Sequence, residues 1–172
     1  MNKGLFMLDL MEIERELGHF LEQQEYGLVD LQVASTGRGR TFRVFVERAE
    51  GTPADLADCT HLSPMVSLFL QSLGVFTNEC ALEVSSPGAD RVLRKPEDFA
   101  RFKGSRVQLS LRLEGRQFTV RGHLQGMEDD RVMLRSTELP RAIEGTRGIA
   151  RDGESLLVPR DLISTVRLVP DV

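Results

Sequence analysis

The residues best suited to bind a metal or to carry out acid–base chemistry are two cysteines and three histidines: Cys59, Cys80, His19, His61 and His123. They form neither a C-x-x-C nor an H-x₃-H pattern, and two positions as close as Cys59 and His61 face different sides of one helix. Both cysteines fall on apolar faces of their predicted elements, where an unpaired cysteine commonly serves as a small hydrophobic side chain. The sequence therefore predicts no metal site and no cofactor.

Nucleotide binding and nucleophilic catalysis lack their usual motifs. The segment Gly37-Arg38-Gly39-Arg40 leads into a strand, so it is not the glycine-rich turn at a helix N-terminus that binds phosphate. The segment Ser85-Ser86-Pro87-Gly88 does not form a G-x-S-x-G elbow. The histidines lie on separate predicted elements, with no carboxylate placed to orient them. We therefore expect a protein that is not an enzyme and takes no small-molecule substrate.

Arginine is the most suggestive residue type, because 19 of the 22 basic residues are Arg. Its planar fork of donors suits phosphate and carboxylate groups. Two groups stand out, one around a predicted hairpin turn and one on a polar strand face that also holds Gln108 and His123: Arg38, Arg40 and Arg43, and Arg112 and Arg121. Both groups are candidates for RNA or partner contacts, and both also fit an ordinary solvated surface.

Composition and charge exclude several classes of protein. The 172 residues are 41% hydrophobic, enough for a core and too apolar for intrinsic disorder. No apolar run approaches the roughly 18 residues of a membrane span, and acidic residues interrupt the N-terminal stretch, unlike a signal peptide. Ten aromatic residues argue against a base-stacking surface. The net charge of −4 does not exclude an RNA partner, since a local patch decides that. We expect a cytoplasmic protein with no membrane partner.

The periodicity of the N-terminal half predicts helix–strand–strand–helix–strand. Apolar residues recur at helical spacing in the first and fourth segments and alternate in the others. The expected segments are residues 5–24, 28–34, 42–47, 52–74 and 79–85. Thr52 is expected to cap the second helix, with Pro53 at its first position. Pro64 predicts a kink or a break near residues 60–64.

The C-terminal half reads as all-β after one short helix over residues 97–102. Five short strands, with one turn of helix before the last, predict a small SH3-like or Sm-like barrel. Residues 136–153 show no clear period, as expected for an irregular hairpin or a mobile loop. The expected fold class is α+β, with an N-terminal α/β domain over residues 1–92 and a C-terminal barrel over residues 93–172.

The string Leu82-Glu83-Val84-Ser85-Ser86-Pro87-Gly88-Ala89-Asp90-Arg91-Val92-Leu93 resembles the bacterial ribosome maturation factor RimP family. Phe99–Gly104, Tyr26–Asp30 and Val158–Ile163 extend the resemblance over the chain. It implies an N-terminal α/β domain, a C-terminal Sm-like barrel and a cytoplasmic, non-enzymatic assembly factor. Such a factor binds the free, immature small (30S) ribosomal subunit and aids rRNA folding. It also aids incorporation of a ribosomal protein near the decoding centre, which contacts the barrel.

Four residues in and after this string are candidates for a ribosome-facing patch: Ser86, Gly88, Arg91 and Arg94. Their alternative role is to hold the two domains in register, with Pro87 fixing φ and Gly88 free to take positive φ. A rival function is an Sm-like RNA chaperone that forms an oligomeric ring, which would need an open, apolar barrel edge. We expect a monomer, which would exclude the ring.

Overall fold

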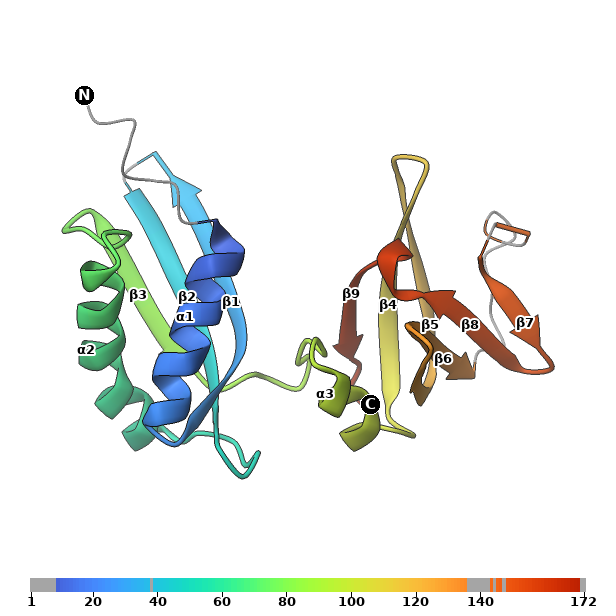
Figure 1. The fold of residues 1–172 in the computed structure, drawn as a ribbon, viewed down its shortest axis with the longest axis horizontal. Helices are drawn as coiled ribbons and strands as arrows, with labels where there is room; N and C mark the ends of the chain where they lie inside the picture. The colour runs from blue at the N-terminus through green and yellow to red at the C-terminus, as the bar shows by residue number, and fades with distance from the viewer. Residues whose placement is uncertain (1–8, 38, 136–142, 144, 147, 171–172) are drawn as a thin grey trace. The chain divides into compact units, whose positions relative to one another are not determined.

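The computed structural model of the chain describes residues 9–37, 39–135, 143, 145–146 and 148–170. The chain divides into two compact units, Met1–Pro87 and Gly88–Val172, each with its own hydrophobic core (Figure 1). This division falls five residues before the 92/93 boundary placed from the sequence. Val92 belongs to the second unit, because it forms a β-bridge with Arg167 there.

The first unit is a three-stranded sheet with two helices. Its elements are α1 Leu10–Gln23, β1 Tyr26–Thr36, β2 Gly39–Arg48, α2 Leu56–Ser72 and β3 Cys80–Ser85. The strand order is β1-β2-β3, with β1 and β2 antiparallel and β2 and β3 parallel. A parallel pair needs a crossover connection, which α2 supplies. Figure 1 shows both helices on the same face of the sheet. The predicted element order is confirmed.

Alternating and helical apolar patterns build the core of this unit. The first helix buries Ile13, Leu17 and Leu21, which recur every four residues. It begins at Leu10, and residues 5–8 of the expected helix lie outside the described part of the chain. The strand β2 buries Phe42, Val44 and Val46, as its alternation predicts. The sheet face opposite the helices, which includes Arg43 and Glu83, stays exposed.

The start and the interior of α2 both differ from expectation. Asp55 caps the helix in a capping box with Asp58, whereas Thr52 donates to the Glu50 carboxylate. Pro53 is outside the helix. The predicted break at Pro64 does not occur, and the helix runs through it. We attribute this continuity to the buried stripe on the sheet side of α2, whose burial outweighs the roughly 3 kcal/mol cost of an interior proline: Cys59, Leu62, Val66 and Leu70.

The second unit is a short helix and a six-stranded antiparallel sheet. Its elements are α3 Pro96–Arg101, β4 Arg106–Leu113, β5 Arg116–Glu128, β6 Arg131–Arg135, β7 Ala150–Asp152, β8 Ser155–Pro159, the 3₁₀ helix η2 Arg160–Leu162, and β9 Ile163–Leu168. The strand order is β7-β8-β6-β5-β4-β9. The turn of helix before the last strand is as predicted, and β7 is an additional strand.

The expected barrel is corrected in one respect, because the ladder among the described strands is open. Its edges are β7 and β9, and no pairing joins them. The backbones of β5 and β6 approach closely at Gly122, where an added Cβ would collide with the carbonyl oxygen of Arg135. The free side of β9 is occupied by the chain that precedes α3. There Leu93 N–H donates to Val166 (2.8 Å), and Leu168 N–H donates to Arg91 (2.9 Å).

Candidate nucleic-acid interface

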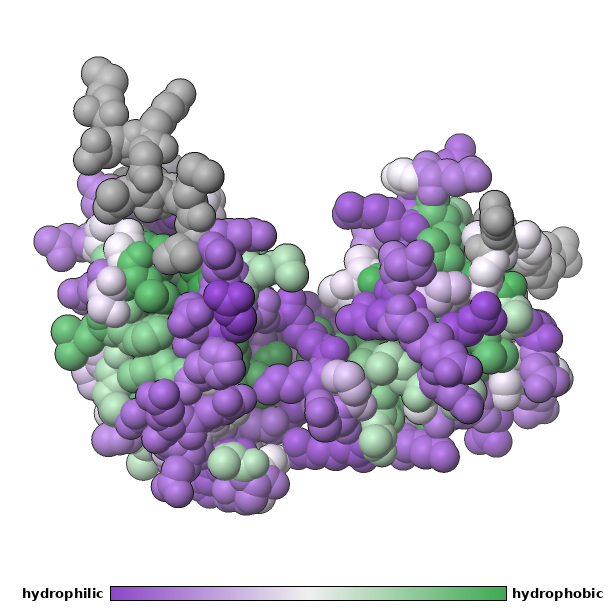
Figure 2. Space-filling view, viewed as in Figure 1, coloured by the Kyte–Doolittle hydropathy of each residue, from purple (hydrophilic) through white to green (hydrophobic). Residues whose placement is uncertain are grey.

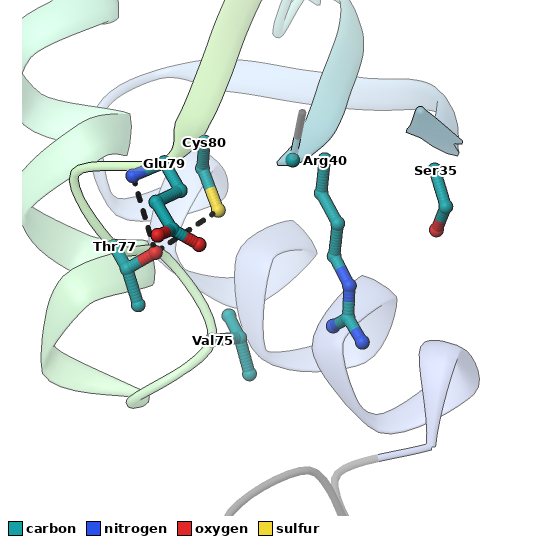
Figure 3. A pocket seen from close by; sticks show the side chains of 7 residues that line it. Ser35, Arg40, Val75, Thr77, Glu79 and Cys80 are labelled. Atoms are coloured by element: carbon teal, nitrogen blue, oxygen red, sulfur yellow. Dashed lines mark hydrogen bonds between the residues drawn. The ribbon is translucent and has the colours of Figure 1, made fainter. Parts of the chain in front are cut away.

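The β1–β2 hairpin is the first place where the sequence predicted phosphate contacts. Arg38 lies outside the described residues. Arg40 lines a pocket of about 230 Å³ together with Ser35, Glu79 and Cys80 (Figure 3). The strand can approach Glu79 only because residue 39 is glycine, with φ of +140° and no Cβ to meet the Glu79 carbonyl oxygen. Arg40 thus sits where β1, β2 and the start of β3 converge.

Arg43 lies on the exposed face of the same sheet, away from the pocket. Its Nε donates to the Glu83 carboxylate at 2.9 Å, and both side chains are about half exposed. The pair follows from the parallel register of β2 and β3, which sets the two residues opposite each other. The exposed carboxylate offsets part of the charge that Arg43 offers a phosphate group.

A hydrogen-bonded cluster at the start of α2 was not predicted from the sequence. Asp58 accepts hydrogen bonds from the Tyr26 hydroxyl (2.7 Å), Arg48 Nε (2.9 Å) and the backbone N–H of Asp55 (2.9 Å). These donors lower the pKa of Asp58 to about 2, with the Asp55 N–H contributing most. The hydrogen bond from the Tyr26 hydroxyl to Asp58 raises the pKa of Tyr26. The cluster fastens α2 to the β1–β2 hairpin and is structural in character.

The segment proposed as a ribosome-facing patch divides between interior and surface. Ser86 is half-buried, and its backbone makes a hydrogen bond with Cys59. Gly88 is exposed, but its φ is not positive, so the expectation of a left-handed residue is corrected. Pro87, the preceding residue, closes the first unit. Neither Ser86 nor Gly88 carries a charge that could attract a phosphate group.

Arg91 is buried and takes part in the core of the second unit. Its Nη2 donates to Asp98 Oδ1 at 2.9 Å, and its guanidinium lies 5.1 Å from the ring centre of Phe102. These contacts place its side chain in the interior of the second unit. Arg94 is exposed. Partial desolvation lowers the pKa of Arg94, and the positive charge of nearby Arg160 lowers it further.

The outward face of the second sheet brings together more arginines than the sequence predicted. Arg121 lies opposite Gln108 and donates to its side chain at 2.9 Å, and the two residues share the polar strand face that alternation predicted. Arg112, on the same face of β4, is opposite Gln117. The register adds three arginines to this face: Arg106, Arg135 and Arg167. Arg106 continues the alternation of β4, whereas only the order of the strands could have revealed Arg135 and Arg167, since β6 and β9 lie on either side of the β4–β5 hairpin.

The two cysteines differ in exposure. Cys59 is buried, and desolvation raises the pKa of its thiol. Cys80 is only half-buried, which corrects the expectation of two buried thiols, and its Sγ lies 3.6 Å from the Thr77 hydroxyl (Figure 3). In the described part of the chain, His, Cys, Asp and Glu side chains do not gather in threes as a metal site requires. Within the same residues, no helix has the length and apolar character to cross a membrane.

A comparison with protein families matches residues 16–90 to the model of the RimP N-terminal domain. The matched residues begin inside α1 and end just beyond the first unit, and they include the cluster around Asp58 and the three hairpin arginines Arg38, Arg40 and Arg43. They also contain most of the Leu82–Leu93 string that carried the sequence resemblance. Sequence string, element order and family match agree that residues 16–90 form a RimP N-terminal domain.

Proposed function

We propose that this protein is a ribosome maturation factor that acts in the cytoplasm on the small (30S) ribosomal subunit. The match to the RimP N-terminal domain over residues 16–90 carries the proposal. The protein binds the free, immature subunit and performs no covalent chemistry. It acts by differential binding: it favours an rRNA or ribosomal-protein conformation of the precursor and leaves once the mature surface has formed.

The two units contribute different contacts to this proposed function. On the first unit, the hairpin arginines Arg38, Arg40 and Arg43 are offered to rRNA phosphates. The second unit is proposed to contact the ribosomal protein that joins near the decoding centre, the role expected of an Sm-like barrel. The first unit also exposes apolar side chains on α2, where Leu56 and Leu68 are 83% and 66% exposed. Figure 2 shows hydrophobic residues on the surface over this helix.

Sedimentation of ribosomal particles tests the proposal. In a density gradient of cell extract, the tagged protein is expected with free small subunits and absent from translating ribosomes. A strain lacking the protein is expected to accumulate incompletely assembled small subunits. Recovery of the protein mainly with large subunits or polysomes would contradict the proposal.

The rival function, a ring-forming RNA chaperone, requires the sheet edges of neighbouring copies to pair. One edge is already in use, because residues 91–93 hydrogen-bond to β9. The other edge is β7, a strand of three residues. Short and covered edges resist association between copies. We therefore propose a monomer, and a single sedimentation coefficient matching 19.3 kDa in analytical centrifugation is the expected result.

A further inference from the structure

The sheet of the second unit turns one face to its core and the other to solvent. On β4, Val107, Leu109 and Leu111 are fully buried, so the alternate positions from Arg106 to Arg112 face outward. On β5, Val120 is buried, and Arg121 and His123 are exposed. The outward face is therefore defined by register, independently of any side-chain rotamer.

Cross-strand neighbours on this face form rows. One row runs Arg167, Gln108, Arg121 across β9, β4 and β5, and the next runs Arg106, His123, Arg135 across β4, β5 and β6. Neighbouring strands lie about 4.8 Å apart, so each row extends about 10 Å. We call the five arginines on this surface the arginine face: Arg106, Arg112, Arg121, Arg135 and Arg167.

The positions around the arginines are mostly neutral. On β4, β5 and β9, the other outward residues of these rows and of the two beside them are Gln, Ser, Thr and His: Gln108, Ser110, Gln117, Thr119, His123 and Thr165. The row of Arg135 continues through Ser155 on β8 to Asp152 on the edge strand β7, which adds one carboxylate at the end of that row. Glu128 faces Arg131 beyond the bulge of β5, outside the rows. Asp90 approaches Arg167 only at 3.7 Å, with 73% of its side chain exposed. The face thus concentrates positive charge although the whole chain carries a net charge of −4.

We propose that the arginine face binds the sugar–phosphate backbone of RNA, so that the second unit contacts rRNA directly as well as a ribosomal protein. The inference rests on the proposed function and deepens it. Arginines spaced over a polar sheet surface suit repeated phosphates, which need positive charge and donors but no pocket. A protein that bound this face would need acidic side chains to pair with its arginines. The ribosomal-protein contact is therefore assigned elsewhere on this unit.

Titration of a labelled, mixed-sequence single-stranded RNA with the full chain tests the proposal. The test variant is Arg106→Gln, Arg112→Gln and Arg135→Gln together. The matched control removes the same charge away from the face: Arg15→Gln, Arg101→Gln and Arg151→Gln. The test variant is expected to bind RNA roughly tenfold to 100-fold more weakly at 0.1 M salt. Its slope of log affinity against log salt should be smaller by about 2, since each lost phosphate contributes about 0.7.

The control variant is expected to keep the affinity and the salt slope of the unchanged protein, and thermal unfolding verifies that both variants fold. Equal losses in the two variants would show an effect of net charge alone and overturn the proposal. Unchanged RNA affinity in the test variant would also overturn it, and if subunit binding fell at the same time, the face would be a protein contact. Failure of the unchanged protein to sediment with small subunits would instead remove the proposed function.

Discussion

The guanidinium of Arg91 and the carboxylate of Asp98 meet 2.9 Å apart inside the second unit, with 8% and 11% of their side chains exposed. Asp98 also accepts the backbone N–H groups of Arg94 and Lys95 at 3.1 Å. One carboxylate therefore joins the chain that leaves the first unit to the start of α3. A residue that the sequence motif offers to the ribosome is instead part of this unit's framework.

Removing the carboxylate from this pair is expected to destabilise the second unit. Asp98→Ala leaves the Arg91 charge buried without its counter-ion, which typically costs about 3–5 kcal/mol. Calorimetric unfolding of the full chain measures the loss. The control is Asp90→Ala, whose exposed contact with Arg167 is worth at most about 1 kcal/mol. Equal effects of the two substitutions would contradict the framework role of Arg91 and Asp98.

The position of the unit boundary makes a separate prediction about fragments. Residues 1–87 and 88–172 are each expected to unfold cooperatively, because each contains a complete core. A fragment over residues 93–172 lacks Arg91 and the Val92–Arg167 bridge, so it should be less stable than 88–172. Denaturant titration followed by circular dichroism compares the two. Equal midpoints would place the boundary at 92/93, as the sequence pattern suggested.

Two neighbouring glycines in the first hairpin are expected to respond differently to alanine. Gly39→Ala should destabilise the first unit by about 2 kcal/mol or more, because φ is +140° and a Cβ would collide with the Glu79 carbonyl. Gly37→Ala is the control, since its φ is not positive and nothing lies within 4 Å of an added Cβ. Thermal unfolding of both variants measures the difference. A destabilised Gly37→Ala with an unaffected Gly39→Ala would refute this account.

Acid is expected to weaken the first unit through Asp58. Its pKa is lowered from 3.8 to about 2 in the folded chain, so folding favours the ionised carboxylate. The resulting stability is present above pH 3.8 and is lost as the pH falls toward 2. Tyr26 is the only tyrosine and there is no tryptophan, so its fluorescence reports on this unit alone. Asp58→Asn should be less stable than the unchanged protein at pH 7, and this difference should shrink between pH 4 and 2. A constant difference across that range would contradict the prediction.

The two thiols are expected to react at different rates with a thiol reagent. Cys59 is buried and its pKa is raised by desolvation, so it should label slowly in the folded chain. Cys80 is half-buried beside Thr77 and should label faster. Mass spectrometry of labelled peptides distinguishes the two, and in denaturant both should react quickly. Equal rates in the folded protein would contradict the difference in exposure.

The sequence predicted the first unit better than the second because the elements and core positions of the first unit follow local sequence patterns. Helical spacing and alternation place Leu17, Phe42 and Val46 correctly in the core. Local rules failed where packing or sheet closure intervened. Pro64 does not break α2, since tertiary burial offsets its cost. The described strands of the second unit form an open ladder, where the sequence predicted a small barrel.

For the candidate site, the sequence patterns identified the residue types but not which of these residues lie next to one another in the fold. Alternation placed Gln108 and Arg121 on one polar face, and the strand register then sets them opposite each other. Alternation could not place Arg167 in the same row, because that pairing joins positions 59 residues apart. Burial likewise separated Arg91, within the string, from Arg94, which directly follows it, although both were candidates for the same patch. Long-range register and solvent exposure are the two quantities that a single sequence does not display.

The adjacency of β4 and β9 also sets the order in which the chain can fold as it is synthesised. Once residue 85 has left the ribosome, the first unit has all its strands and can complete its core. The second unit has to wait, since its first long strand pairs with its last: Val107 lies opposite Leu168. Until β9 is available, the edge of β4 that pairs with it and the apolar side of the β4–β5 hairpin stay uncovered. The second unit therefore stays incompletely folded, with apolar surface open to aggregation, until the end of the chain has left the ribosome.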